Sequence, residues 1–130
     1  MRQRRATTGV MAALVLLTGA CGGGDSTPAA PTVSAGAVDL TITALDPKYS
    51  YDKESYAAKA GVITIELVNG GKENHNLLVQ GVPSKTFKLT ASRPGDRKVA
   101  AVQLSAGTYT VYCDIAGHRK AGMEARLVVS

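Results

Sequence analysis

The sequence predicts an all-β domain, and three observations support this prediction. Apolar and polar residues alternate with the period of a β-strand in several short runs between residues 38 and 130. Turn-forming residues separate these runs, as at Asp46-Pro47 and Asn69-Gly70-Gly71. The 93 residues from 38 to 130 are enough for one modest hydrophobic core. Short strands with turns at this spacing favour a sandwich of two sheets.

The alternation places most of the strands in order along the chain. Strands are expected at residues 38–44, 63–68, 75–79, 100–104, 107–113 and 124–129. Residues 49–59 are ambiguous, because they fit a loop with a short strand and also a single helical turn at 54–59.

The first twenty residues have the pattern of a secretory signal peptide. A polar start that contains Arg2, Arg4 and Arg5 precedes the short apolar run 10–17 and the small residues 18–20. The apolar run is far shorter than the roughly 20 residues of a spanning helix. Residues 17–21 resemble a bacterial lipobox, with cleavage before Cys21 and acylation of Cys21. Thr18 departs from that pattern, and an ordinary cleaved signal is the alternative.

Residues 21–37 are expected to form a flexible linker. The segment consists almost entirely of Gly, Ser, Thr, Pro and Ala, and it lacks the apolar residues that an ordered core requires. A lipidated Cys21 followed by such a spacer would tether the domain at 38–130 to a membrane. The expected location is therefore the extracytoplasmic face of a bacterial membrane.

Charge and composition exclude several classes of protein. The formal net charge of +5 falls to +2 when the three arginines of the signal peptide are removed. So small a charge, with no basic run beside stacking aromatics, excludes nucleic acid as a partner. The single short apolar run excludes a polytopic membrane protein. We expect the mature protein to be a monomer.

The candidate metal ligands are concentrated near the end of the sequence. Cys113, His118 and Met123 form a Cys-x4-His-x4-Met string between the last two expected strands, and His75 lies upstream in Asn-His-Asn. One thiolate, two imidazoles and one thioether are the ligand set of a blue copper site, in which the Met is a weak axial ligand. Gly117 and Gly122 allow the tight turns that would direct three side chains of one loop at a single point.

The strings TYTVYCDIAGHRKAGM (108–123) and ENHNLLV (73–79) resemble the cupredoxins, the type 1 blue copper proteins that include plastocyanin, azurin and sulfocyanin. The resemblance implies a Greek-key β-sandwich of seven to eight strands and one mononuclear copper ion. It implies His75, Cys113, His118 and Met123 as ligands and electron transfer rather than enzymatic catalysis as the function. Asn76 would brace the ligand loop, and Tyr112 matches a tyrosine on a possible electron route. The gap from Cys113 to His118 is longer than in plastocyanin, so the resemblance is to the wider family.

Taken one at a time, the four residues also fit ordinary roles in a hydrophobic core. Cys113, His75 and Met123 each share a strand face with apolar neighbours, and a free Cys is often a small buried hydrophobe. A disulfide between Cys21 and Cys113 is a further alternative, but Cys21 lies beyond the linker and would be acylated. A free thiol is prone to oxidation outside the cytoplasm, and coordination of a metal would protect Cys113 from it.

Other metal and catalytic sites fit the sequence less well. A binuclear copper site would need a second Cys in the loop, where Gly117 stands, and multicopper enzymes need more His than the two present. A structural zinc site would not use Met, and a hydrolase based on Cys113 would leave Met123 unexplained.

We therefore expect a lipid-anchored carrier of single electrons. Two alternatives stay open: an extracytoplasmic copper-delivery protein without redox cycling, and a copper-free interaction domain. Redox partners are expected to dock near His118, whose ring edge would be exposed. The docking surface would include other residues of the loop end, namely Ile115, Ala116, Ala121, Val82 and Pro83, and Arg119 and Lys120 would favour an acidic partner.

Overall fold

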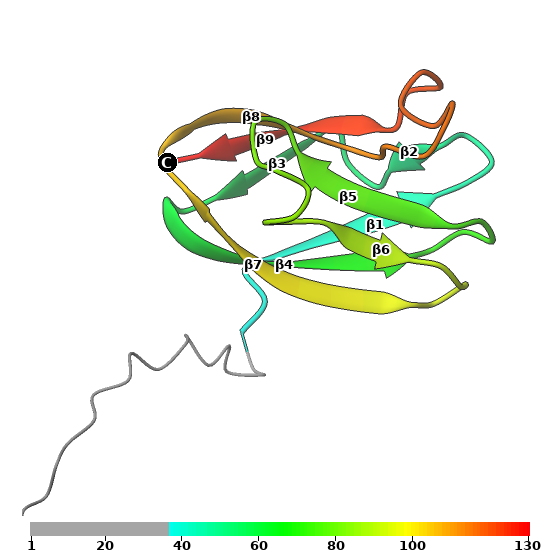
Figure 1. Cartoon of the computed structure of the whole chain (residues 1–130), viewed down its shortest axis with the longest axis horizontal. Coiled ribbons are helices and arrows are strands. Elements are labelled where there is room, and N and C mark those ends of the chain that lie inside the picture. Colours follow the sequence, from blue (N-terminus) through cyan, green and yellow to red (C-terminus); the bar gives the residue numbers. More distant parts are fainter. Residues whose placement is uncertain (1–36) are drawn as a thin grey trace, which may run out of the picture. The chain divides into compact units, whose positions relative to one another are not determined.

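Residues 37–130 are described by a computed structural model, and they form nine strands and no helix (Figure 1). The expected signal peptide, Cys21 and residues 21–36 of the linker lie outside the described residues. Within the described range, nothing has the length and apolarity of a bilayer-crossing helix. The strands are β1 (Leu40–Leu45), β2 (Ser50–Tyr51), β3 (Ser55–Ala58), β4 (Gly61–Asn69), β5 (His75–Val79), β6 (Leu89–Ala91), β7 (Arg97–Leu104), β8 (Gly107–Tyr112) and β9 (Glu124–Val129).

The all-β prediction is confirmed, but the number of strands exceeds the seven to eight expected. The ambiguous segment 49–59 forms β2 and β3 rather than a helical turn. The alternation also gave no sign of β6. Strands of two and three residues, such as β2 and β6, are too short to show a period of two.

The strands form two sheets, in the orders β2-β1-β4-β7 and β3-β9-β8-β5-β6. Most neighbours are antiparallel, but β1 pairs in parallel with β4, and β3 pairs in parallel with β9. In the first parallel pair, Ala44 lies opposite Asn69. The chain therefore leaves β1 and β4 at the same end of the sheet, and the residues that follow the two strands become neighbours.

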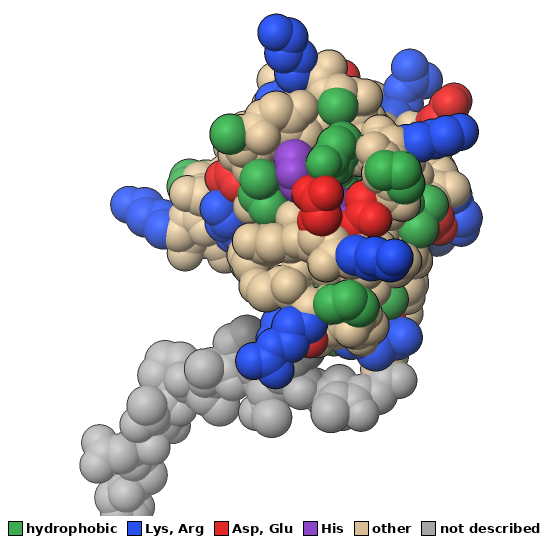
Figure 2. Space-filling model, turned by 90° about the vertical axis from the view of Figure 1, so that its right-hand side faces the viewer, with side chains coloured by type: hydrophobic (Ala, Val, Ile, Leu, Met, Phe, Trp, Pro, Cys, Tyr) green, Lys and Arg blue, Asp and Glu red, His purple; other side chains and the backbone are tan. Residues whose placement is uncertain are grey.

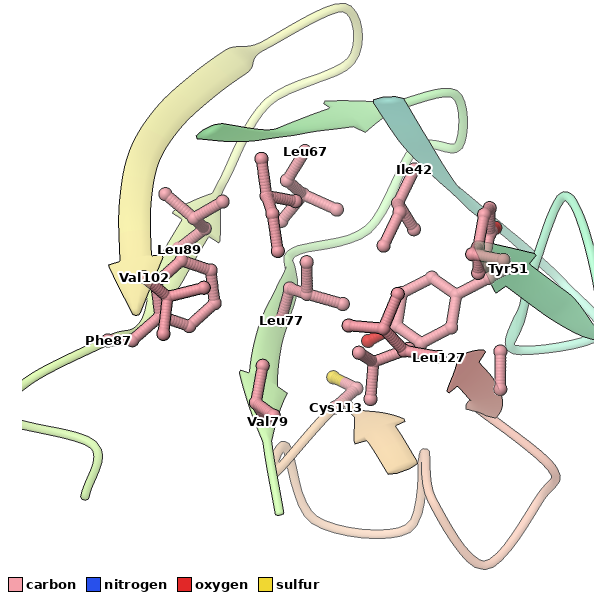
Figure 3. Close-up of a cluster of buried hydrophobic side chains, with 14 of the residues drawn as sticks. Ile42, Tyr51, Leu67, Leu77, Val79, Phe87, Leu89, Val102, Cys113 and Leu127 are labelled. Atoms are coloured by element: carbon pink, nitrogen blue, oxygen red, sulfur yellow. The ribbon is translucent and has the colours of Figure 1, made fainter. Parts of the chain in front are cut away.

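The core lies between the two sheets, and Figure 3 shows one cluster of its side chains. Ile42, Ile65, Leu77 and Leu127 are completely buried. These positions belong to the apolar faces that the alternation predicts. Burial of one such side chain contributes about 1.5–3 kcal/mol, so the two facing apolar layers hold the sheets together.

Three connections gather at one end of the sandwich, on the right in Figure 1. They are the β1–β2 turn at 46–49, the β4–β5 turn at 70–74 and the β8–β9 loop at 113–123. The predicted metal ligands come from this end, which Figure 2 views directly.

Candidate metal centre

Three of the four predicted ligands converge on one point. The donor atoms of His75, Cys113 and His118 all lie within 4.8 Å of one another. The Cys113 Sγ and the His118 Nδ1 are 3.6 Å apart. All three side chains are buried, so a metal ion bound among them would be shielded from water.

Met123 is completely buried and belongs to the same hydrophobic core cluster as Cys113. Its backbone N–H donates to the His118 carbonyl at 3.0 Å, and its carbonyl accepts from the Cys113 N–H at 3.1 Å. These two bonds close the β8–β9 loop and fix Met123 between the other two loop residues. The structure thus keeps all four predicted ligands at one end of the core.

The β8–β9 loop owes its tight course to glycine. Gly117 has φ 87° and Gly122 has φ 115°, both in the region that residues with a side chain avoid. The loop turns repeatedly on itself, with bonds from His118 N–H to the Ile115 carbonyl and from Gly122 N–H to the Arg119 carbonyl. A short segment can therefore present Cys113, His118 and Met123 inward.

The His75 ring is oriented by a hydrogen bond on its far side. Its Nε2 lies 3.2 Å from Asp46 Oδ2, whereas its Nδ1 is buried and has no hydrogen-bond partner within residues 37–130. A buried polar atom without a partner is rare and calls for an explanation. Coordination of a metal ion by Nδ1 would supply one, and the thiol, imidazole and thioether donors nearby suit copper.

The Cys113 sulfur lies in an apolar setting at the edge of the core cluster (Figure 3). Burial raises the pKa of the Cys113 thiol, and the backbone N–H groups of Asn76 and Ile115 partly oppose that shift. Without a metal, Cys113 is therefore a neutral thiol at physiological pH. The same two N–H groups are positioned to stabilise a thiolate once a cation is bound.

Asn76 links β5 to the residue after Cys113. Its side-chain oxygen accepts from the Asp114 backbone N–H at 2.9 Å, and its amide nitrogen donates to the Asp114 carboxylate. Lys88 completes this group with an ion pair to Asp114 at 2.8 Å. Asn76 is thus placed where a residue that braces the ligand loop would lie.

The expectation of an exposed His118 edge differs from the structure. The His118 side chain is only 9% exposed, because the ring of Tyr49 lies over it with centroids 4.3 Å apart. The Tyr49 hydroxyl donates to the Glu73 carboxylate at 3.1 Å, and Glu73 Oε2 lies 3.9 Å from His118 Nε2. Desolvation lowers the pKa of His118, which favours a neutral imidazole able to bind a metal.

Tyr112 lies on the outer side of β8, half-buried under the Arg119 guanidinium at 4.3 Å from the ring centroid. Arg119 also pairs with Glu124 at 2.9 Å and donates to Gln80. These contacts hold Arg119 against its own domain, so Lys120 is the freer of the two cations expected to meet a partner.

Sequence reasoning missed Asp46, Tyr49 and Glu73. All three lie in turns next to the cluster. Glu73 begins the recognised string ENHNLLV, but nothing in that string assigned it a role, and Asp46 and Tyr49 lie outside both strings. The turn residue Asp46 could have been connected to His75 only through the parallel pairing of β1 with β4, which local alternation does not reveal.

Comparison with known proteins supports the copper interpretation. A family model of the sulfocyanin (SoxE) domain matches residues 69–130, the part of the chain that contains all four predicted ligands. The fold matches auracyanin from the photosynthetic bacterium Roseiflexus castenholzii with a TM-score of 0.63 and 16% identity, over 72% of this chain and 98% of that one.

Two other solved structures have a similar fold. Auracyanin A from Chloroflexus aurantiacus, described as a blue copper protein, matches with a TM-score of 0.57 and 20% identity, over 69% of this chain and 96% of that one. An azurin from Methylomonas sp. strain J matches with a TM-score of 0.59 and 15% identity, over 72% and 99% of the two chains. At these identities the likeness shows the fold, and the donor set supports a single type 1 copper ion.

Proposed function

We propose that this chain is a cupredoxin and that it carries single electrons between redox partners, a proposal that the sulfocyanin-domain match over residues 69–130 and the shared fold support. His75, Cys113, His118 and Met123 would hold the copper ion. Bound copper would supply a reversible one-electron change between Cu(II) and Cu(I). The observation that carries the proposal is the buried convergence of two imidazoles and a thiol, with the Nδ1 of His75 left without a partner.

The protein residues prepare this site in three ways. The β8–β9 loop presents three side chains through its two positive-φ glycines. The core around Met123 and Cys113 excludes water. Backbone N–H groups near the sulfur favour the charged thiolate. A site so constrained suits fast electron transfer, because little must move when the oxidation state changes.

Burial of the site also helps to distinguish electron transfer from the alternative function of copper delivery. A protein that hands over a metal benefits from ligands that a recipient can reach. Here the four ligand residues range from fully buried to 7% exposed. This arrangement favours electron transfer over delivery.

Redox partners are proposed to dock at the end of the sandwich shown in Figure 2. A small area of histidine is visible there among hydrophobic and acidic side chains, with Lys and Arg farther out. His118 is the ligand nearest this surface, and Tyr49 covers its ring. The partner would therefore contact Tyr49 and the neighbouring β8–β9 loop. Weak electron-transfer encounters use small interfaces of this kind.

The chain is further proposed to act at the extracytoplasmic face of a bacterial membrane, anchored through an acylated Cys21. The signal-like residues 1–20 and the spacer 21–37 support this proposal. The anchor would keep a monomeric domain near membrane-bound partners while the spacer lets it move between them.

Addition of Cu(II) to the purified protein tests the proposed function. We expect an intense thiolate-to-copper absorption band that a reductant bleaches and an oxidant restores. Cys113→Ser should abolish the band, and Cys21→Ser, which removes the only other Cys, should leave it unchanged. Colour that persists in Cys113→Ser would contradict the ligand assignment, and a colourless Cu(I)-only complex would favour copper delivery.

A further inference from the structure

Asp46 concentrates three donors on a single oxygen. Its Oδ2 accepts from the backbone N–H of Lys72 at 2.7 Å and of Glu73 at 2.9 Å, and it lies 3.2 Å from His75 Nε2. An oxygen that meets three donors suits the acceptor-only form of the side chain, so Asp46 is a carboxylate here. It joins the β1–β2 turn to the turn before β5.

The approach of these two turns depends on Gly71. A Cβ at this position would lie only 2.0 Å from Asp46 Oδ2, so any side chain would displace the carboxylate. Asn69 holds the turn in place, because its side-chain oxygen accepts from the Gly71 N–H at 2.9 Å. The contact between Asp46 and His75 is thus built into the backbone on both sides.

The contact also selects one tautomer of His75. A carboxylate is only an acceptor, so Nε2 must carry the proton that it donates to Asp46. In the neutral ring, Nδ1 then has a free lone pair. This is the buried nitrogen that lacks a partner, in a ring that offers a donor atom within 4.8 Å of those of Cys113 and His118.

We propose that Asp46 is a positioning residue that orients His75 for copper and, through its negative charge, favours Cu(II) over Cu(I). This inference rests on the copper site of the proposed function but not on the identity of any redox partner. The carboxylate side chain is 10% exposed, so solvent screens its charge only weakly. A negative charge next to a ligand stabilises the doubly charged ion more than the singly charged one. A carboxylate on the outer nitrogen of a metal-binding His also makes the ring a better ligand.

Asp46→Asn removes the negative charge of the side chain but keeps an oxygen that can accept the same hydrogen bonds. Because all three donors meet at Oδ2, the amide oxygen of Asn can take that place and accept the same three bonds. We expect a higher reduction potential by voltammetry and Cu(II) binding that is 10–100-fold weaker. Cu(I) affinity should change less. A tenfold loss confined to Cu(II) corresponds to a rise of about 59 mV.

Asp96→Asn is the matched control. Asp96 Oδ2 likewise accepts two backbone N–H bonds, from Ser92 and Arg93, and it has no side-chain bond to any proposed ligand within residues 37–130. Its substitution should leave the potential unchanged. Two outcomes would overturn the charge effect. In the first, Asp46→Asn has the same reduction potential as the unaltered protein. In the second, Asp46→Asn and Asp96→Asn shift the potential equally.

A copper-free measurement tests the orientation of His75 separately. Nitrogen-15 NMR of the copper-free protein should show His75 protonated on Nε2, and Asp46→Ala or Gly71→Ala should abolish that preference. An unaltered tautomer in both variants would overturn the positioning role, even if the protein failed to turn blue. An unaltered protein without the thiolate band would instead contradict the proposed function itself.

Discussion

Tyr49 stacks on the imidazole of His118, with ring centroids 4.3 Å apart and planes inclined by 35°. The same tyrosine meets the His75 ring edge-on at 6.4 Å. It does so from a backbone with φ 50°, an uncommon conformation for a residue with a side chain. Strain of this kind persists only where surrounding contacts impose it, and the two imidazoles and Glu73 provide those contacts.

Removal of the Tyr49 ring should loosen the site. Tyr49→Ala loses both the stacking on His118 and the bond to Glu73, so we expect the free energy of unfolding to fall by about 1–2 kcal/mol. Tyr49→Phe keeps the ring and loses only the exposed hydroxyl bond, and its effect should stay below about 1 kcal/mol. Denaturant unfolding of the copper-free protein measures both. An equal loss in the two variants would show that the ring contributes nothing.

The same pair of variants tests the docking surface. With Tyr49→Ala the His118 ring becomes accessible, so electron exchange of the copper-loaded protein with a small inorganic oxidant should become faster. Tyr49→Phe should behave as the unaltered protein. Stopped-flow absorbance of the thiolate band follows the rate, and an unchanged rate in Tyr49→Ala would place the electron route elsewhere.

Gly117 should be intolerant of any side chain. Gly117→Ala forces alanine to φ 87°, which costs about 1–2 kcal/mol of stability and shifts the loop that carries His118. Gly107→Ala is the control, because Gly107 lies outside the left-handed region and an added Cβ there meets only ordinary contacts at 3.6 Å or more. Thermal unfolding of both variants gives the comparison. Similar stability losses would count against conformational strain at Gly117.

Leu77 tests whether the sandwich core supports the site. Leu77→Ala removes a completely buried side chain two residues after His75 in β5, and we expect the free energy of unfolding to fall by about 2–5 kcal/mol. Val62→Thr, at a position that is 64% exposed, keeps the β-branched shape and should change stability by less than about 0.5 kcal/mol. Chemical denaturation distinguishes them, and a loss below about 1 kcal/mol for Leu77→Ala would contradict the packing.

The proposed membrane anchor depends on a single residue. Cys21→Ser removes the acylation site, so the protein should move from the membrane fraction to the soluble fraction of expressing bacteria. The intact mass of the unaltered protein should show the added acyl groups. Retention of Cys21→Ser in the membrane fraction, or an unmodified mass, would leave an ordinary signal peptide as the better interpretation.

Local sequence patterns predicted the apolar faces of the longer strands. The spacing of Cys, His and Met residues predicted the four ligands. Strand β9 was predictable because its residues alternate between exposed and buried over the whole strand. The buried positions are Ala, Leu and Val, so the alternation can be read from the residue types. Strand β5 is different, since all five of its residues are buried, and its position depended on only a short run. The ligands were recognisable because rare residue types recur at a familiar spacing.

Contacts around the ligands could not be predicted in the same way. Asp46 and His75 are separated by 29 positions and meet only because β1 and β4 run in parallel. The Tyr49 ring reaches His118 from a segment that local patterns left ambiguous. Side-chain neighbours of this kind follow from how the strands pair, and no local period encodes that pairing.

The division of the ligands between one loop and one strand affects how the protein responds to copper when it is denatured. Cys113, His118 and Met123 lie in the one loop between the adjacent strands β8 and β9, whereas His75 comes from β5 in the same sheet. An unfolded chain can therefore still offer a thiolate, an imidazole and a thioether to the ion. Because binding to the unfolded chain reduces the stabilisation that a ligand gives to the native state, copper should raise the melting temperature less than its affinity for the folded protein implies.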